Sequence, residues 1–178
     1  MIIKYTVGLL AGLLLSTSAF AGYSAAVEYG NGNATNLTEV AVTRDFERQW
    51  FTDGDWLVSG FWEASFANWQ GRSDAGNNRN INDFGLTPVF RFQQKSPSGW
   101  APYVEGAIGF HLISPTQINT ERRFSTAFQF GDHVGFGVRL GEHQQFDLGY
   151  RFQHVSNGSI KKPNSGINFN EIRFAYHF

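Results

Sequence analysis

Two side chains that could act together in catalysis stand two residues apart near the C-terminus. His154 offers an imidazole base and Ser156 offers a hydroxyl nucleophile. Residues 146–153 before them alternate between large apolar and small or polar side chains, which predicts a strand with one apolar and one polar face. The same alternation puts His154 and Ser156 on the apolar face, at the end of the strand. Apolar faces seldom carry such a pair, so the pattern indicates a catalytic site.

A serine nucleophile also needs donors for the negative charge that develops on the substrate oxygen. Residues i and i+2 on one face of a strand lie about 6–7 Å apart at their Cα atoms, a gap that side chains can close. Asn157, Asn164 and the backbone amides around Gly158 follow the serine closely. These groups are the predicted donors of the oxyanion site.

The imidazole needs a hydrogen-bond acceptor that holds it in the correct orientation. Asn168 opens the last predicted strand, which pairs with the strand of His154. Ten residues separate Asn168 from Phe178, so Asn168 shares the apolar parity of that strand. The side-chain carbonyl of Asn168 is therefore a candidate for the orienting group.

The N-terminus has the features of a secretory signal peptide. Lys4 precedes an apolar run at residues 5–15, and residues 19–21 read Ala-Phe-Ala. The run is too short for a good membrane-spanning helix. We expect cleavage after Ala21, so that residues 1–21 are the signal peptide and residues 22–178 form one mature domain.

The composition excludes several classes of protein. The formal net charge of -1 does not suggest a nucleic-acid partner, and the chain has no cysteine for disulfides. Neither a P-loop, a dinucleotide fingerprint nor an HExxH motif is present, and the five histidines lack ligand-like spacing, so we expect no cofactor and no metal site. The 18 phenylalanines and 20 glycines fit an exported β-barrel with an aromatic outer surface.

Eight alternating segments follow the leader and predict an all-β protein, an eight-stranded antiparallel transmembrane β-barrel. Segments of about ten residues suit a tilted strand that crosses a bilayer, and an even number closes an antiparallel barrel. Gly131-Asp132-His133 could be a turn, but the unbroken parity on both sides favours one long sixth strand. The predicted strands are residues 23–30, 37–48, 56–69, 81–93, 101–112, 124–140, 146–156 and 168–178.

Charged residues on the polar faces predict a buried network inside the barrel, because a small barrel is filled by its own side chains. If both termini lie on the periplasmic side, the seventh strand runs outward. His154 and Ser156 then lie at the outer leaflet, facing lipid. The predicted network consists of Glu63, Arg91, Glu105, Arg139, Arg151, Glu171 and Arg173.

The C-terminal segment resembles the lipid A 3-O-deacylase family, of the PagL type. The resemblance rests on residues 154–158 (HVSNG), residues 162–167 (KPNSGI) and the aromatic-ended last strand. Members are eight-stranded barrels of the Gram-negative outer membrane that release a 3-hydroxy fatty acid from the 3-position of lipid A. The resemblance implies lipid A, in lipopolysaccharide, as the substrate, Ser156 as the nucleophile and His154 as the general base. It also implies that Asn157 and Asn164 lie near the site.

The chain departs from the family pattern at the third catalytic position. Well-known members carry a Glu where this chain has Asn168. Three interpretations stay open: Asn168 orients the imidazole, a bulge brings Glu171 to the site, or the site has little or no activity. Lys161 and Lys162 could attract lipid A phosphates or only solubilise their loop.

Other functions compete with the deacylase interpretation. A non-enzymatic structural or adhesion barrel would tolerate exchange of His154 and Ser156. Another lipid enzyme, a phospholipase or an acyltransferase, would act on phospholipid or add a chain to lipid A. A narrow channel is a further alternative, although eight strands leave little room for one. The sequence leaves the oligomeric state open, a homodimer included.

Overall fold

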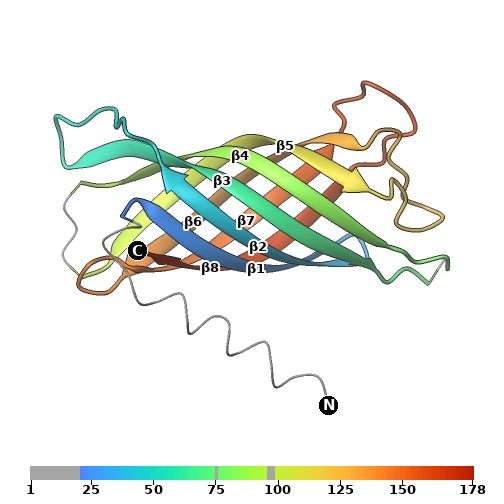
Figure 1. Ribbon diagram of the computed structural model, residues 1–178, viewed down its shortest axis with the longest axis horizontal. Helices are drawn as coiled ribbons and strands as arrows, with labels where there is room; N and C mark the ends of the chain where they lie inside the picture. Colours follow the sequence, from blue (N-terminus) through green and yellow to red (C-terminus); the bar gives the residue numbers. More distant parts are fainter. Residues whose placement is uncertain (1–20, 75, 96–98) are drawn as a thin grey trace, which may run out of the picture.

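Eight antiparallel strands close into a barrel in the computed structural model, which describes residues 21–74, 76–95 and 99–178 (Figure 1). Each strand pairs with its neighbours in sequence, and β1 pairs with β8 to complete the ring. This confirms the predicted fold; the predicted signal peptide, except Ala21, lies outside the described residues. The strands are β1 Tyr23–Gly32, β2 Thr35–Asp45, β3 Trp56–Gly71, β4 Asn80–Gln94, β5 Ala101–Ser114, β6 Phe128–Leu140, β7 Phe146–Ser156 and β8 Ile167–His177.

Two predicted strand boundaries are wrong by several residues. β2 ends at Asp45 because Phe46 turns outward, bonds its amide to the Gly60 carbonyl and packs its ring over Gly60. β6 begins at Phe128, and residues 124–127 belong to the preceding loop. Phe124 fits the alternating pattern of the strand because it is apolar, so the pattern assigned it to the outward face. In the structure it is buried in the mouth of the barrel. Residues 131–133 lie within β6 and make no turn, as predicted.

The outer surface of the barrel is apolar along most of its length. No helix in the described part of the chain is long and apolar enough to cross a membrane. Outward-facing side chains on every strand follow the alternation predicted from the sequence. They include Val27, Val40, Val42, Phe84, Leu86, Val104, Ile108, Phe110, Val134, Phe136, Leu148, Ile172 and Phe174.

The middle of the barrel lumen holds a network of buried ion pairs. Arg151 lies at its centre, within 2.7–2.8 Å of carboxylate oxygens of Glu28, Glu63 and Glu105. Removal of one partner from such a network leaves uncompensated buried charge, so each member depends on the others. Five of the seven predicted members, Glu63, Arg91, Glu105, Arg151 and Arg173, form these pairs.

The remaining predicted members behave differently. Glu171 is buried in the lumen, but Arg139 is only half-buried and donates to the carbonyl of Gln144 at 3.0 Å. The prediction missed Glu28 and Asp147. Asp147 accepts bonds from Arg91 and from the hydroxyl of Tyr103.

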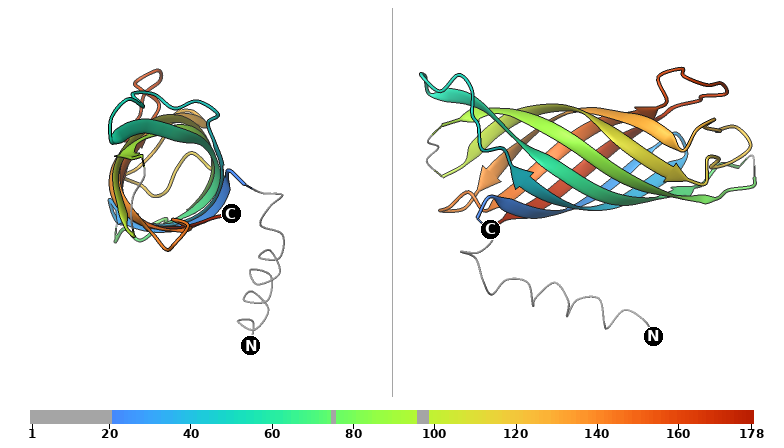
Figure 2. Two further views of the ribbon diagram at one scale, coloured as in Figure 1. Left: turned by 90° about the vertical axis from the view of Figure 1, so that its left-hand side faces the viewer. Right: turned by 45° about the horizontal axis from the view of Figure 1, so that its top comes forward.

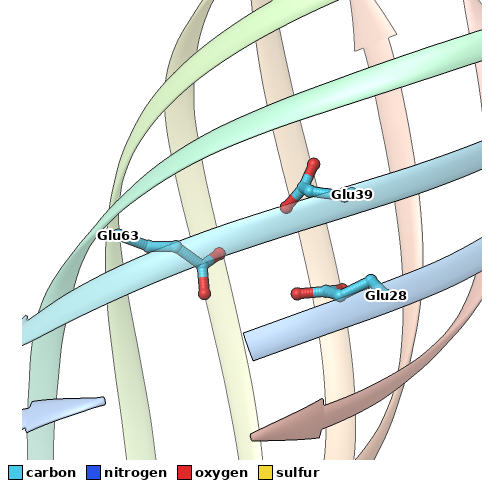
Figure 3. Close-up of side chains that lie close together, drawn as sticks. All are labelled: Glu28, Glu39 and Glu63. Carbon is cyan, nitrogen blue, oxygen red and sulfur yellow. The ribbon is translucent and has the colours of Figure 1, made fainter. Parts of the chain in front are cut away.

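Three carboxylates come close together on the lumen side of β1, β2 and β3 (Figure 3). Glu28, Glu39 and Glu63 each place an oxygen within 4.8 Å of the others. Arg151 already bonds two of these three carboxylates. Its guanidinium supplies the positive charge that a metal ion would otherwise bring, so the cluster belongs to the ion-pair network.

An apolar plug fills the lumen at the distal end of the barrel, which is the end formed by the loops after β1, β3, β5 and β7. Two plug residues, Ile118 and Phe124, come from the β5–β6 loop (residues 115–127) and not from a strand. The filled lumen argues against the channel alternative. The plug consists of Leu37, Ala67, Trp69, Ile81, Ile113, Ile118, Phe124, Val155, Ile167 and Phe169.

Replacement of Arg151 by leucine is expected to destabilise the barrel by roughly 3–5 kcal/mol, because three buried carboxylates lose their shared partner. Urea unfolding in detergent micelles, followed by tryptophan fluorescence, measures this change. Arg48→Leu, at an exposed site after β2, is the control and should leave stability within about 0.5 kcal/mol of the wild type. An Arg151→Leu barrel as stable as the control would contradict the central role of the network.

Candidate active site

The imidazole of His154 is held by a side chain from the neighbouring strand. His154 and Asn168 face each other in register on β7 and β8, and His154 Nδ1 lies 2.6 Å from Asn168 Oδ1. An amide oxygen only accepts hydrogen bonds, so the proton of this bond belongs to Nδ1. In the neutral imidazole this leaves Nε2 as the acceptor, which is the tautomer that a general base requires.

Asn168 is itself fixed by the turn between β1 and β2. Its backbone amide donates to Asn33 Oδ1 at 2.9 Å. Gly32 lies so close that a Cβ there would sit 1.8 Å from the carbonyl oxygen of Asn168, so only glycine fits at that position. The acceptor for His154 therefore rests on a rigid strand end.

Ser156 lies on the same outward face as His154 and is half-buried. The amide of Gly158 donates to Ser156 Oγ at 3.5 Å. Within the described chain, no hydrogen bond joins Ser156 to His154. Catalytic hydrogen bonds are often long without substrate and tighten when it binds, so the shared face is the relevant geometry.

The three predicted oxyanion residues take different positions. The Gly158 amide points at the serine hydroxyl. The Asn157 side chain is fully buried and donates to the Lys161 carbonyl at 2.8 Å, away from the serine. Asn164 Oδ1 accepts the Asn157 backbone amide at 3.3 Å, which braces the loop from residue 157 to residue 166. Asn164 is half-exposed, so its side-chain NH₂ can still serve as a donor.

Glu171 does not reach the site. It pairs in register with Arg151, three residues beyond the pairing of Asn168 with His154, and the ladder between the two pairs is unbroken. Its side chain is buried in the lumen. The alternative in which a bulge brings Glu171 to His154 is therefore wrong, and Asn168 is the residue of β8 that contacts the imidazole.

Two residues beside His154 were missed as site residues in the sequence. Gly166 has a φ of +57° and is buried, and a Cβ there would lie 3.0 Å from His154 Cε1 and 3.6 Å from Ser156 Cβ. The Gly166 backbone thus rests against both catalytic candidates. Asp132 is exposed on β6, in register with His154 on the side opposite Asn168. The sequence does carry a signal for Asp132: it is an acidic residue on the outward, apolar face, between Phe130 and Val134.

An apolar groove of about 700 Å³ runs along the outer surface next to these residues. This volume lies in the range of ligand-binding pockets. Phe152, two residues before His154 on the same face, forms part of its wall, and Asp132 brings a carboxylate to it. The other lining residues are Pro88, Phe90, Gly106, Ala107, Ile108, His133 and Val134.

These features define a class of protein: a membrane β-barrel that gathers a histidine, a serine and an asparagine on its outward face, near an apolar groove. A family model described as lipid A 3-O-deacylase (PagL) matches residues 36–177, which include the whole site. The chain belongs to the lipid A 3-O-deacylase (PagL) family. Family membership makes the protein a carboxylic ester hydrolase of the outer membrane and sets aside the non-enzymatic barrel.

Individual relatives agree with this assignment. The chain is 25% identical over 158 residues to the lipid A deacylase PagL of Pseudomonas aeruginosa, covering 89% of this chain and 87% of the relative. It is 30% identical over 129 residues to the protein of the same name from Bordetella bronchiseptica, covering 72% of this chain and 57% of that one. The crystal structure of the outer membrane enzyme PagL superposes with a TM-score of 0.77 at 20% identity, covering 87% of this chain and 99% of that chain. This last likeness confirms the barrel fold.

Gly166→Ala is expected to lower esterase activity by about 10²-fold, because the added Cβ would press on the imidazole and displace it. The assay is ester hydrolysis by the purified barrel in detergent micelles. Gly76→Ala is the matched control: Gly76 also has a positive φ, of +81°, but a Cβ there meets nothing within 4 Å. Equal losses in the two variants would mean that backbone strain, and not contact with His154, causes the effect.

Proposed function

We propose that this protein hydrolyses the ester that joins a 3-hydroxyacyl chain to the 3-position of lipid A, with Ser156 as nucleophile and His154 as general base. The observation that carries the proposal is the 2.6 Å contact between His154 Nδ1 and Asn168 Oδ1. It selects the tautomer whose Nε2 can accept a proton, on the same face as a serine. The relatives are named as lipid A deacylases, which supplies the substrate.

The orientation of the barrel supports a site in the outer leaflet. The C-terminus lies at one end of the barrel, and the β7–β8 loop with the site lies at the other (Figure 2). In barrels with periplasmic termini the distal end faces the cell exterior, where the membrane surface is lipopolysaccharide. We place His154 and Ser156 at this surface, with the signal peptide of residues 1–21 removed during export.

The reaction follows from the geometry of the site. Ser156 Oγ attacks the ester carbonyl of lipid A while His154 Nε2 takes its proton. The Gly158 amide and the side-chain NH₂ of Asn164 donate to the oxyanion of the tetrahedral intermediate. When the intermediate collapses, the bond between the acyl carbon and the 3-oxygen of the sugar breaks, and this oxygen takes the proton from His154 and leaves as a hydroxyl. Water activated by His154 then hydrolyses the acyl ester on Ser156, which releases the 3-hydroxy fatty acid and restores the serine. The apolar groove beside Phe152 is the place for the acyl chain.

The role of the missing family glutamate is divided between two neighbours of His154. Asn168 orients the imidazole but carries no charge. Asp132, in register on the other neighbouring strand, supplies a negative charge that stabilises the imidazolium formed in the reaction. Side chains opposite each other on paired strands lie about 4.5–5.5 Å apart at Cβ, close enough for this effect.

Mass spectrometry of lipid A from outer membranes that contain the protein tests the proposed activity. The wild type should remove one 3-hydroxyacyl chain from lipid A, and Ser156→Ala should leave lipid A intact. Ser159→Ala, at an exposed serine of the same loop, is the control and should act like the wild type. Unchanged lipid A with a folded wild-type barrel would refute the deacylase, and loss of chains from phospholipid instead would favour a phospholipase.

The charge beside His154 is expected to stabilise the imidazolium that forms during the reaction. Asp132→Asn should therefore lower kcat and Asn168→Glu should raise it, because the first removes a carboxylate next to His154 and the second adds one. Asn170→Glu, the next outward residue of β8, should give a smaller change. Initial rates of lipid A hydrolysis by the purified barrels measure these effects, and changes of kcat in the same direction in the Asn168 and Asp132 variants would exclude the divided role.

A further inference from the structure

The loop between β5 and β6 is rooted in the barrel lumen. Ile118 and Phe124 are almost fully buried in the apolar plug, and the Phe124 ring packs edge-on against Trp69 with centroids 6.1 Å apart. The loop also closes on itself, since the Arg122 amide donates to Asn119 Oδ1 at 2.9 Å. These contacts make residues 118–124 a fixed platform at the distal end.

This platform holds the β7–β8 loop through several hydrogen bonds. Phe124 and Asn164 form an antiparallel bridge. The Ser165 amide donates to the Arg123 carbonyl at 3.3 Å, and Ser125 Oγ donates to the Pro163 carbonyl at 2.5 Å. Residues 163–165 are therefore attached along their length to the β5–β6 loop.

Arg122 makes the contact closest to the candidate active site. Its Nη1 donates to the carbonyl of Gly166 and lies 3.5 Å from the carbonyl of Ser165. The guanidinium is half-buried, and burial lowers the pKa of Arg122 from its usual value while Glu121 opposes the shift. The group stays charged, and a partly desolvated cation binds carbonyl oxygens more strongly than an exposed one.

We propose that Arg122 is a positioning residue for deacylation: it holds the Gly166 backbone against His154 and Ser156. Gly166 links the two residues directly: its carbonyl accepts the hydrogen bond of Arg122, and its backbone packs against the edge of the His154 imidazole. Without the guanidinium, Gly166 is free to move away and His154 loses one wall of its site. Nη1 reaches both carbonyls, so a neutral side chain at this position would lose the charge-assisted hydrogen bond to the Gly166 carbonyl.

This role rests on the proposed function and differs from general support of the fold. Arg122 lies in a loop outside the ion-pair network of the lumen, and the barrel ladder closes without it. Its loss should therefore change the turnover step more than substrate binding or stability. Arg123 is the matched control, because it is the next residue, carries the same charge and is exposed.

The test compares Arg122→Ala and Arg123→Ala in lipid A hydrolysis by purified barrels. We expect Arg122→Ala to lower kcat by about 10- to 100-fold with KM changed less than about threefold, and Arg123→Ala to keep the wild-type kcat. Ethylguanidinium at concentrations below those that denature proteins should restore part of the kcat of Arg122→Ala, because it can fill the vacated position. An unchanged kcat in Arg122→Ala, or a lowered kcat that ethylguanidinium does not restore, would overturn the proposal.

Hydrogen exchange of the folded barrels separates this proposal from the proposed function. Arg122→Ala should raise exchange in residues 157–166 and leave the β strands unchanged, and Arg123→Ala should leave exchange in both unchanged. If the wild type hydrolyses no lipid A, the deacylase fails, and the exchange experiment still decides whether Arg122 holds this segment. Unaltered exchange in Arg122→Ala would overturn the proposed contact whatever the activity.

Discussion

Closure of the barrel determines where every strand side chain lies. Once β1 pairs with β8, each strand residue has only two environments, the lumen or the outer surface, and parity along the strand chooses between them. Arg151 falls inside and completes the ion-pair network, whereas His154 and Ser156 fall outside, on the face whose Phe152 lines the apolar groove. Asn168 and Glu171 are three residues apart and so face opposite sides, which leaves the amide and not the carboxylate beside the imidazole.

The parts of the fold that depend on alternation could be predicted from the sequence, and the parts that depend on loops could not. The eight strands, the burial of Arg151 and the outward parity that Asn168 shares with His154 follow from a period of two and from the count back to the C-terminus. Phe124 was assigned to the wrong element because an apolar residue fits the strand pattern equally well whether it faces lipid or packs in the apolar plug. Asp132 required the register between β6 and β7, and alternation along a single strand does not determine register.

The amide beside His154 changes how the proposed site handles charge. A carboxylate at a membrane surface must be desolvated, which costs free energy unless it is paired. Asn168 selects the same histidine tautomer without that cost, and its backbone is fixed by Asn33. A neutral amide stabilises an imidazolium less than a carboxylate would, so in the proposed mechanism the compensating charge comes from another strand. Asp132 is in register with His154 and exposed, so it satisfies this requirement where Glu171, inside the lumen, does not.

The support of the site runs from the lumen outward. A catalytic group on a strand end is only as precise as the backbone around it. Here the backbone of Gly166 is bonded by Arg122, and the loop of Arg122 is anchored by Ile118 and Phe124 in the apolar plug. The ion-pair network in the middle of the lumen and the plug at the distal end therefore have different roles. The ion pairs neutralise the carboxylates that alternation directs into the lumen, and so hold the strands together. The plug gives the loops beside His154 a rigid support.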